Sequence, residues 1–253
     1  MRRPALFCVG QPPGVLDALM AKKQSTLSVA LRATGALFSN LHIVIPLAGV
    51  LGILVAALDI AVLQILAPGA MGSAGVDQGD LLAIMLGWWG VIIAVEILLG
   101  PIAAAMSIYT ARTHSHGGKA SLAQALNFGL ARYSRVFKWH AAAWLTIQVG
   151  MIVLVPGILF LLQYAFVDSI LCLEDEKWPL ERSSKLTKGR RGRIFALVFL
   201  WLVVNQVVGF AELAALQYGF PVLALLMTAT YVVNIWVAMV FYQFYEDRTQ
   251  PAS

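Results

Sequence analysis

The sequence predicts an all-α, polytopic integral membrane protein folded as one bundle of about six transmembrane helices. Two observations predict this class. Apolar residues make up 60% of the 253 residues, and charged residues only 12%. Several apolar runs also approach or exceed the roughly 20 residues that a helix needs to cross a ~30 Å hydrocarbon core. In water such runs would leave apolar surface on every side, so we expect the surrounding solvent to be lipid.

Four spans follow from where the apolar runs begin and end. Pro68 and Gly69 stop the first run, because neither residue continues a helix well. Pro101 lies inside the second run and should kink that helix, since its ring clashes with the carbonyl four residues earlier. These spans are expected at about 43–67, 81–110, 194–213 and 219–245.

An apolar run of 35 residues, 139–173, is broken only by Pro156-Gly157, so it forms either one kinked helix or two short helices. Charge decides between them, because loops rich in Lys and Arg stay in the cytoplasm. With two crossings, all 18 basic residues lie on the cytoplasmic side. Two crossings are therefore predicted, with both termini cytoplasmic. Each half is only about 25 Å long at 1.5 Å per residue, which leaves a re-entrant hairpin open.

Two amphipathic stripes precede spans and predict helices that lie in the membrane interface. The first consists of Leu27, Ala30, Leu31, Thr34, Leu37, Phe38 and Leu41. The second consists of Leu122, Ala125, Leu126, Gly129, Leu130, Tyr133, Val136 and Phe137.

The two stripes align, and each leads into a pair of spans, which suggests parallel internal repeats. A charged segment, 174–193, occupies the same place before the last pair. The predicted organisation is a flexible cytoplasmic leader at 1–25, one membrane domain at 26–245 and a cytoplasmic tail at 246–253. The repeat units within the domain are expected at 26–112, 121–173 and 179–245. An interfacial helix before any span can converge on the same pattern, so common origin is not the only explanation.

The charged segment predicts a short helix that begins at Pro179, because proline suits the first position and acidic residues suit a helix N-terminus. Glu181 and Lys185 are spaced for an i,i+4 ion pair. Cations beside a span favour anionic lipid headgroups, at about 1 kcal/mol each near the surface. The candidate lipid-binding or partner-binding residues are Arg182, Lys185, Lys188, Arg190, Arg191 and Arg193.

Carboxylates in or near the predicted spans are the strongest chemical signal, because a charge at the centre of a membrane helix costs roughly 2.5–3.5 kcal/mol. No Lys or Arg lies in the spans to pair with them. One hypothesis is a path for protons or cations, formed by Asp59, Glu96, Asp168, Asn205 and Asn234. The alternative, favoured at this stage, is that these side chains hold helices together, at about 0.6 kcal/mol per contact.

No catalytic motif, nucleotide-binding loop or zinc signature occurs in the sequence, so neither enzyme activity nor a cofactor nor a bound metal is expected. His114-Ser115-His116 resembles part of a metal site, but no further ligand accompanies it, and a solvated loop explains it better. The net charge of +5 is attributed to cytoplasmic loops rather than to nucleic-acid binding.

Residues around the charged segment resemble a bacterial family. They are Pro156-Gly157, Glu174, Leu180, Arg182-Ser183, Leu186, Gly189 and Arg193. The segment is similar to the six-span membrane domain that accompanies some glycerophosphodiester phosphodiesterases, and to stand-alone, uncharacterised relatives of that domain. Pro179 departs from the alanine that is usual before Leu180. The resemblance implies a six-helix membrane domain and no catalysis, because the soluble phosphodiesterase barrel is missing.

The preferred expectation is a non-enzymatic membrane anchor, scaffold or lipid-interacting module of a bacterial inner membrane. Its expected partners are the lipid bilayer, anionic headgroups above all, and a protein at the cytoplasmic face. The alternative is a small transporter or channel that uses the intramembrane carboxylates.

Overall fold

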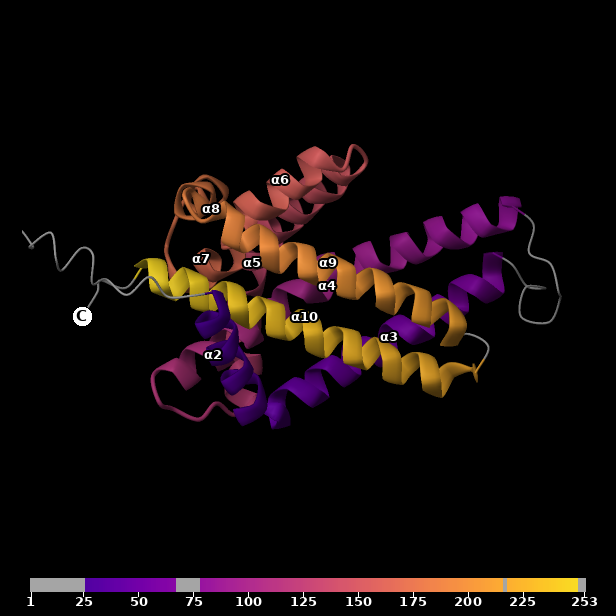
Figure 1. Cartoon of the computed structure of the whole chain (residues 1–253). Coiled ribbons are helices and arrows are strands. Elements are labelled where there is room, and N and C mark those ends of the chain that lie inside the picture. Colours follow the sequence, from indigo (N-terminus) through magenta and orange to yellow (C-terminus); the bar gives the residue numbers. More distant parts are fainter. Residues whose placement is uncertain (1–25, 67–77, 216–217, 250–253) are drawn as a thin grey trace, which may run out of the picture.

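The computed structural model describes residues 26–66, 78–215 and 218–249, and within them the chain is helical with short connections and no strand (Figure 1). The helices are α2 (Thr26–Ser39), α3 (Leu41–Leu66), α4 (Gln78–Ser115), α5 (Leu122–Met151), α6 (Val155–Tyr164), α7 (Val167–Leu173), α8 (Pro179–Thr187), α9 (Arg191–Ala215) and α10 (Phe220–Thr249). The leader 1–25 and residues 250–253 of the tail lie outside the described residues.

Five stretches of the described residues are long and apolar enough to cross a membrane. They are Leu41–Leu66, Trp89–Ser115, Val155–Leu173, Arg191–Glu212 and Phe220–Thr249. The predicted all-α membrane bundle is therefore confirmed, and the number of crossings stays a prediction. Pro101 lies inside α4, as the sequence indicated.

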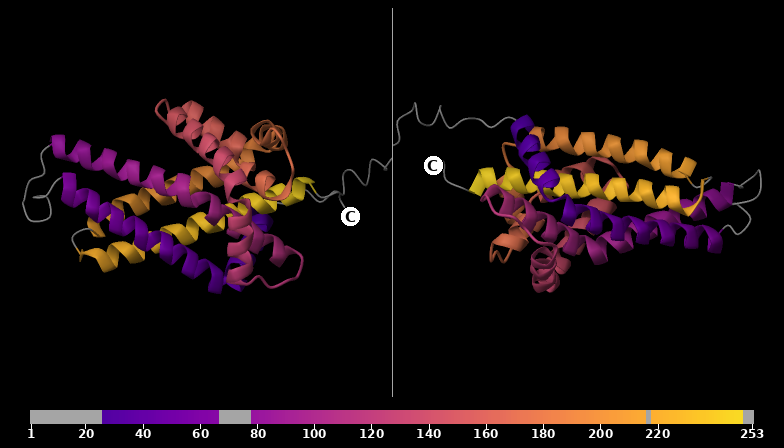
Figure 2. Two further views of the ribbon diagram at one scale, coloured as in Figure 1. Left: turned by 180° about the vertical axis from the view of Figure 1, so that it is seen from behind. Right: turned by 90° about the horizontal axis from the view of Figure 1, so that it is seen from below.

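Four long helices, α3, α4, α9 and α10, run along the bundle, and α2 and α8 lie at the same end of it, on different sides of α10 (Figures 1 and 2). We call this the α8 end. The most extensive contact between helices joins α3 to α10. Gly52 makes that contact close, because a Cβ atom there would lie 2.4 Å from the backbone nitrogen of Thr228 on α10.

Helix α5 corrects the predicted boundary between an interfacial helix and a span. It begins at the capping box of Ser121 and Gln124 and continues unbroken to Met151, through Lys138, where a new span was expected to start. No proline stands between Ser121 and Met151, and Gly129 and Gly150 do not interrupt the helix.

The 35-residue run does fold back on itself, but the turn lies before Pro156-Gly157. It occupies Ile152–Leu154, where Leu154 has a φ of 61°, and Pro156 sits in the first turn of α6. Gly150 and Gly157 let the two helices touch, because a Cβ on Gly150 would lie 2.8 Å from the backbone nitrogen of Gly157. The tip of this hairpin stops well short of the far ends of α3, α4 and α10 (Figures 1 and 2).

Helix α2 has two apolar faces rather than one continuous stripe. Val29, Ala33 and Ala36 are buried in the bundle, and α2 packs mainly against α10. Leu27, Leu31 and Phe38 are 68%, 61% and 64% exposed. The small residues bind α2 to the bundle, and the large exposed ones face outward, where lipid is the apolar medium available.

We predict that Gly52→Ala destabilises the protein, because the methyl group would meet the backbone of α10 and not a side chain that can move. Overpacking of this kind costs about 1–3 kcal/mol, which should lower the midpoint of thermal unfolding in detergent. Gly49→Ala is the matched control on the same helix, since no atom lies within 4 Å of its Cβ position. Equal midpoints for the two variants would contradict the close packing of α3 on α10.

Candidate functional site

A cavity of about 130 Å³ lies among the helices of the bundle, and its wall is more apolar than polar. Five helices line it: α3, α4, α5, α7 and α10. The polar side chains at its wall are Glu96, Ser107, His140, Asp168, Tyr231 and Asn234. This volume holds several water molecules, and these polar side chains give them hydrogen-bond partners.

Small residues on one face of α4 leave the space for this cavity. Glu96, Gly100, Ala103, Ala104 and Ser107 follow one another at helical spacing and all line the cavity. A face with larger side chains would fill the volume and bury Glu96 in apolar contacts. The composition of α4 therefore creates the cavity and places a carboxyl group in it.

His140 and Asp168 form the central polar contact of the site. The imidazole Nδ1 lies 2.9 Å from Asp168 Oδ1, and the side chain of His140 is only 9% exposed. A carboxylate accepts hydrogen bonds, so Nδ1 carries the proton of this contact. The other ring nitrogen, Nε2, is buried and has no hydrogen-bond partner.

The Nε2 atom of His140, which has no partner, and the carboxyl group of Glu96 both lie next to Gly100. A Cβ atom on Gly100 would lie 2.9 Å from His140 Nε2 and 3.0 Å from Glu96 Oε2. The missing side chain keeps that space free for water or a small ion. In the neutral ring Nε2 is an acceptor, so it can take up a proton at this point and release it again.

A break between α6 and α7 places Asp168. The helix stops at Tyr164 and restarts at Val167, which puts Asp168 in the first turn of α7, where a negative charge is favoured. Ser183 of α8 stabilises the break, because its hydroxyl donates to the carbonyl of Gln163 at 2.7 Å and accepts from the N–H of Phe166 at 3.2 Å. Ser183 is fully buried.

The structure gathers three of the five residues of the predicted path in one cavity: Glu96, Asp168 and Asn234. Asp59 and Asn205 are not part of its wall. Asp59 is buried on α3, and its Oδ1 has no hydrogen-bond partner. Asn205 donates to the carbonyl of Trp201 on its own helix, at 2.8 Å.

Sequence reasoning missed His140, Ser107 and Tyr231. His140 stands at the start of an apolar run, which made it look like a boundary residue. The sequence does contain a pattern that indicates the position of His140. Five residues recur at the spacing of one helix face, and all of them are buried: Ala125, Gly129, Val136, His140 and Ala143. Extending the second amphipathic stripe beyond Lys138 would have placed His140 on the inner side.

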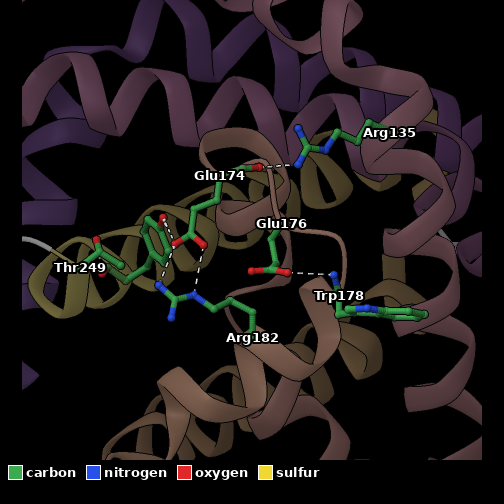
Figure 3. Close-up of polar contacts among 7 residues, drawn as sticks. Arg135, Glu174, Glu176, Trp178, Arg182 and Thr249 are labelled. Atoms are coloured by element: carbon green, nitrogen blue, oxygen red, sulfur yellow. Dashed lines mark hydrogen bonds and ion pairs between the residues drawn. The ribbon is translucent and has the colours of Figure 1, made fainter.

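Glu174 anchors the charged segment through an ion pair and hydrogen bonds (Figure 3). Its carboxylate accepts from Arg182 Nε at 3.1 Å and from the hydroxyl of Tyr245 at 2.8 Å, and Arg135 donates to its carbonyl oxygen. These contacts tie the segment before α8 to α5, α8 and α10. The predicted i,i+4 pair is confirmed, with Lys185 Nζ 2.6 Å from Glu181 Oε1.

Several of the candidate lipid-binding cations have protein partners. Arg182 pairs with Glu174, Lys185 with Glu181, and Arg191 lies 3.5 Å from the hydroxyl of Ser184. Lys188 is exposed, and Arg190 and Arg193 are half-buried at the start of α9. Lys185 is exposed as well, and Arg182 and Arg191 are half-buried, so exposure distinguishes the two lysines from the four arginines.

A second cavity, of about 530 Å³, lies at the α8 end, among α2, α4 and α10. Its wall includes Arg32, His114, His116, Gln243, Glu246 and Asp247. His114 belongs to the last turn of α4, which corrects the predicted loop at that residue, and His116 lies in the turn that follows the helix. Among the described residues, no group of three or more His, Cys, Asp or Glu side chains could hold a metal ion.

Comparisons of the chain with protein-family models, with curated proteins and with solved structures found no match. The resemblance to the six-span membrane domain therefore stays a prediction.

We predict that Gly100→Ala disturbs the cavity, because the methyl group would stand between His140 Nε2 and Glu96 Oε2. The ring must then move away from Asp168 or the helices must separate, at about 1–3 kcal/mol. Thermal unfolding in detergent measures the loss. Gly90→Ala, on the same helix with nothing within 4 Å, is the control and should be no less stable than the parent. A parent-like midpoint for Gly100→Ala would show that the cavity is larger at this point than the structure has it.

Proposed function

We propose that the protein moves protons or small cations across the membrane through the cavity formed by Glu96, His140 and Asp168. The observation that carries the proposal is the buried Nε2 of His140, which lacks a partner and faces, across Gly100, a carboxyl group in the same cavity. Ionisable groups inside a membrane are costly, and they usually mark ion paths or proton relays.

Charge supports a cation over an anion as the transported species. The cavity wall holds two carboxyl groups and, among the described residues, no Lys or Arg. Ser107, Tyr231 and Asn234 add neutral oxygen atoms, which suit a proton carried by water or a small cation. An anion would meet repulsion from Glu96 and Asp168 with no fixed positive charge to offset it.

The proposed orientation follows from the basic residues. No Lys or Arg occurs in 41–111, 139–173 or 194–247, and the α8 end collects those in α8 and in the connections beside it. By the positive-inside rule, we propose that the α8 end faces the cytoplasm of a bacterial inner membrane. Six crossings, or four with a re-entrant α5–α6 hairpin in place of a full span pair, are both compatible with basic residues on that side when the hairpin enters and leaves at the α8 end.

We predict that Glu96→Gln and His140→Gln reduce ion flux by at least about tenfold, because each variant keeps the size of a polar side chain but loses a group that exchanges protons. Purified protein in liposomes, with an imposed pH gradient and a pH-sensitive dye inside, measures this flux. Asn205→Ala is the control, since Asn205 lies outside the cavity wall and should leave the flux unchanged. Parent-like flux in folded Glu96→Gln protein would rule out the proposed path.

A lipid-binding role is the second candidate, and one observation favours it. Exposed Leu27, Leu31 and Phe38 on α2 lie at the same end of the bundle as exposed Lys188. Exposed apolar side chains and an exposed cation at one end of a membrane protein suit contact with anionic lipid at a membrane surface. The same surface is where we would expect a protein partner to bind.

We predict that replacing Lys188 and Arg190 by Gln weakens binding to anionic lipid. At about 1 kcal/mol per cation, the loss should be about tenfold to thirtyfold. Co-purified phosphatidylglycerol, quantified by mass spectrometry, provides the measurement. Replacing Lys119 and Lys138 by Gln removes the same charge elsewhere on the protein. An equal loss for both pairs would indicate an unspecific charge effect and contradict a site at α8.

A further inference from the structure

Helix α9 has an inner face that packs in the bundle. Only 11% of the residues in its apolar window are buried, against 33–44% in the other candidate spans of the described chain. Within α9, Leu197, Leu202, Val204 and Gly209 are half-buried, and a further row of buried or half-buried residues recurs at intervals of four and three. This row consists of Ile194, Val198, Trp201, Asn205, Val208, Glu212 and Ala215. This face lies along α10 and contacts α6.

The opposite face carries a second row with the same heptad spacing. We call it the outer seam, and it consists of Gly192, Ala196, Phe199, Val203, Gln206 and Phe210. Every member is exposed. A repeat of four and three is the spacing with which one helix packs along another, and small residues such as Gly192 and Ala196 allow helices to approach closely.

Gln206 is the polar member of the outer seam, and lipid alone does not explain it. It stands three residues beyond the middle of α9, about 4.5 Å along the axis, which is well inside a ~30 Å hydrocarbon core. A primary amide in hydrocarbon costs several kcal/mol when it has no partner. Asn205, its neighbour in sequence, avoids this cost by donating to the carbonyl of Trp201. Gln206 points outward instead.

We propose that α9 pairs with α9 of a second copy of this chain through the outer seam, with Gln206 bonded to Gln206 across a twofold axis. All copies of a membrane protein insert with the same orientation, so an axis normal to the membrane brings identical residues to identical depth. A primary amide has both donors and an acceptor and is therefore complementary to itself. A different protein would have to supply its own polar group at this depth.

Cysteine cross-linking in native membranes tests the geometry. Cys8 and Cys172 are first replaced by Ser, and single cysteines are then placed at Ala196 or Val203. Both positions lie in the seam, so mild oxidation should give a disulfide-linked dimer. Leu225→Cys is the control, because Leu225 is 72% exposed on α10 and lies outside the seam. Cross-linking at Leu225 as strong as at Val203, or none at either seam position, would overturn the proposal.

Gln206→Leu tests the role of the amide. Interhelical hydrogen bonds contribute about 0.6 kcal/mol on average and up to about 2, so the dissociation constant of the dimer should rise about threefold to tenfold or more. Single-molecule photobleaching in liposomes at several protein densities measures this constant. Gln206→Asn should retain part of the association. An unchanged constant for Gln206→Leu would overturn the amide contact, and a purely monomeric parent protein would overturn the dimer itself. Neither result bears on ion flux through the cavity.

Discussion

The cost of polar groups in hydrocarbon is the constraint on which the rest of this structure depends. His140, Glu96 and Asp168 line a cavity whose wall, among the described residues, has no Lys or Arg to neutralise the carboxyl groups. They are accommodated by a hydrogen bond between two of them and by space for water around the third. The small residues on α4 provide that space, and the break before α7 brings Asp168 into reach.

The sequence was informative where one residue type dictates local structure. Pro179 at the start of α8 and the apolar runs of α3, α4, α9 and α10 could be predicted, because proline and long apolar segments have few alternatives. The continuity of α5 could not, because a change of polarity at Lys138 reports on the surroundings of a helix and not on its backbone. The turn before Pro156 was missed for a related reason, since proline suits the first turn of α6 as well as a loop.

For the candidate site, the carboxyl groups could be predicted from the sequence, whereas His140 beside them was found only in the structure. Glu96 and Asp168 are conspicuous in apolar runs, but nothing in their spacing along the chain indicates that one histidine would stand beside both. That arrangement depends on how α5 and α7 pack against α4, which is a matter of tertiary contacts. His140 brings Glu96 and Asp168 into one cluster, and this cluster is the basis of the proposed ion path.

The hydrogen bonds of α8 connect the end of the bundle to the α6–α7 break, and through that break to Asp168 in the cavity. In the proposed orientation, Ser183 and Glu174 lie at the level of the headgroups. The Ser183 hydroxyl bonds to two backbone groups at the α6–α7 break, the carbonyl of Gln163 and the N–H of Phe166. A molecule that lifts α8 would release those groups, and Asp168, two residues beyond Phe166, would lose its fixed position. The distance between His140 and Asp168 would then change, so if the cavity carries protons as proposed, lipid composition or a bound protein at the surface would affect their movement.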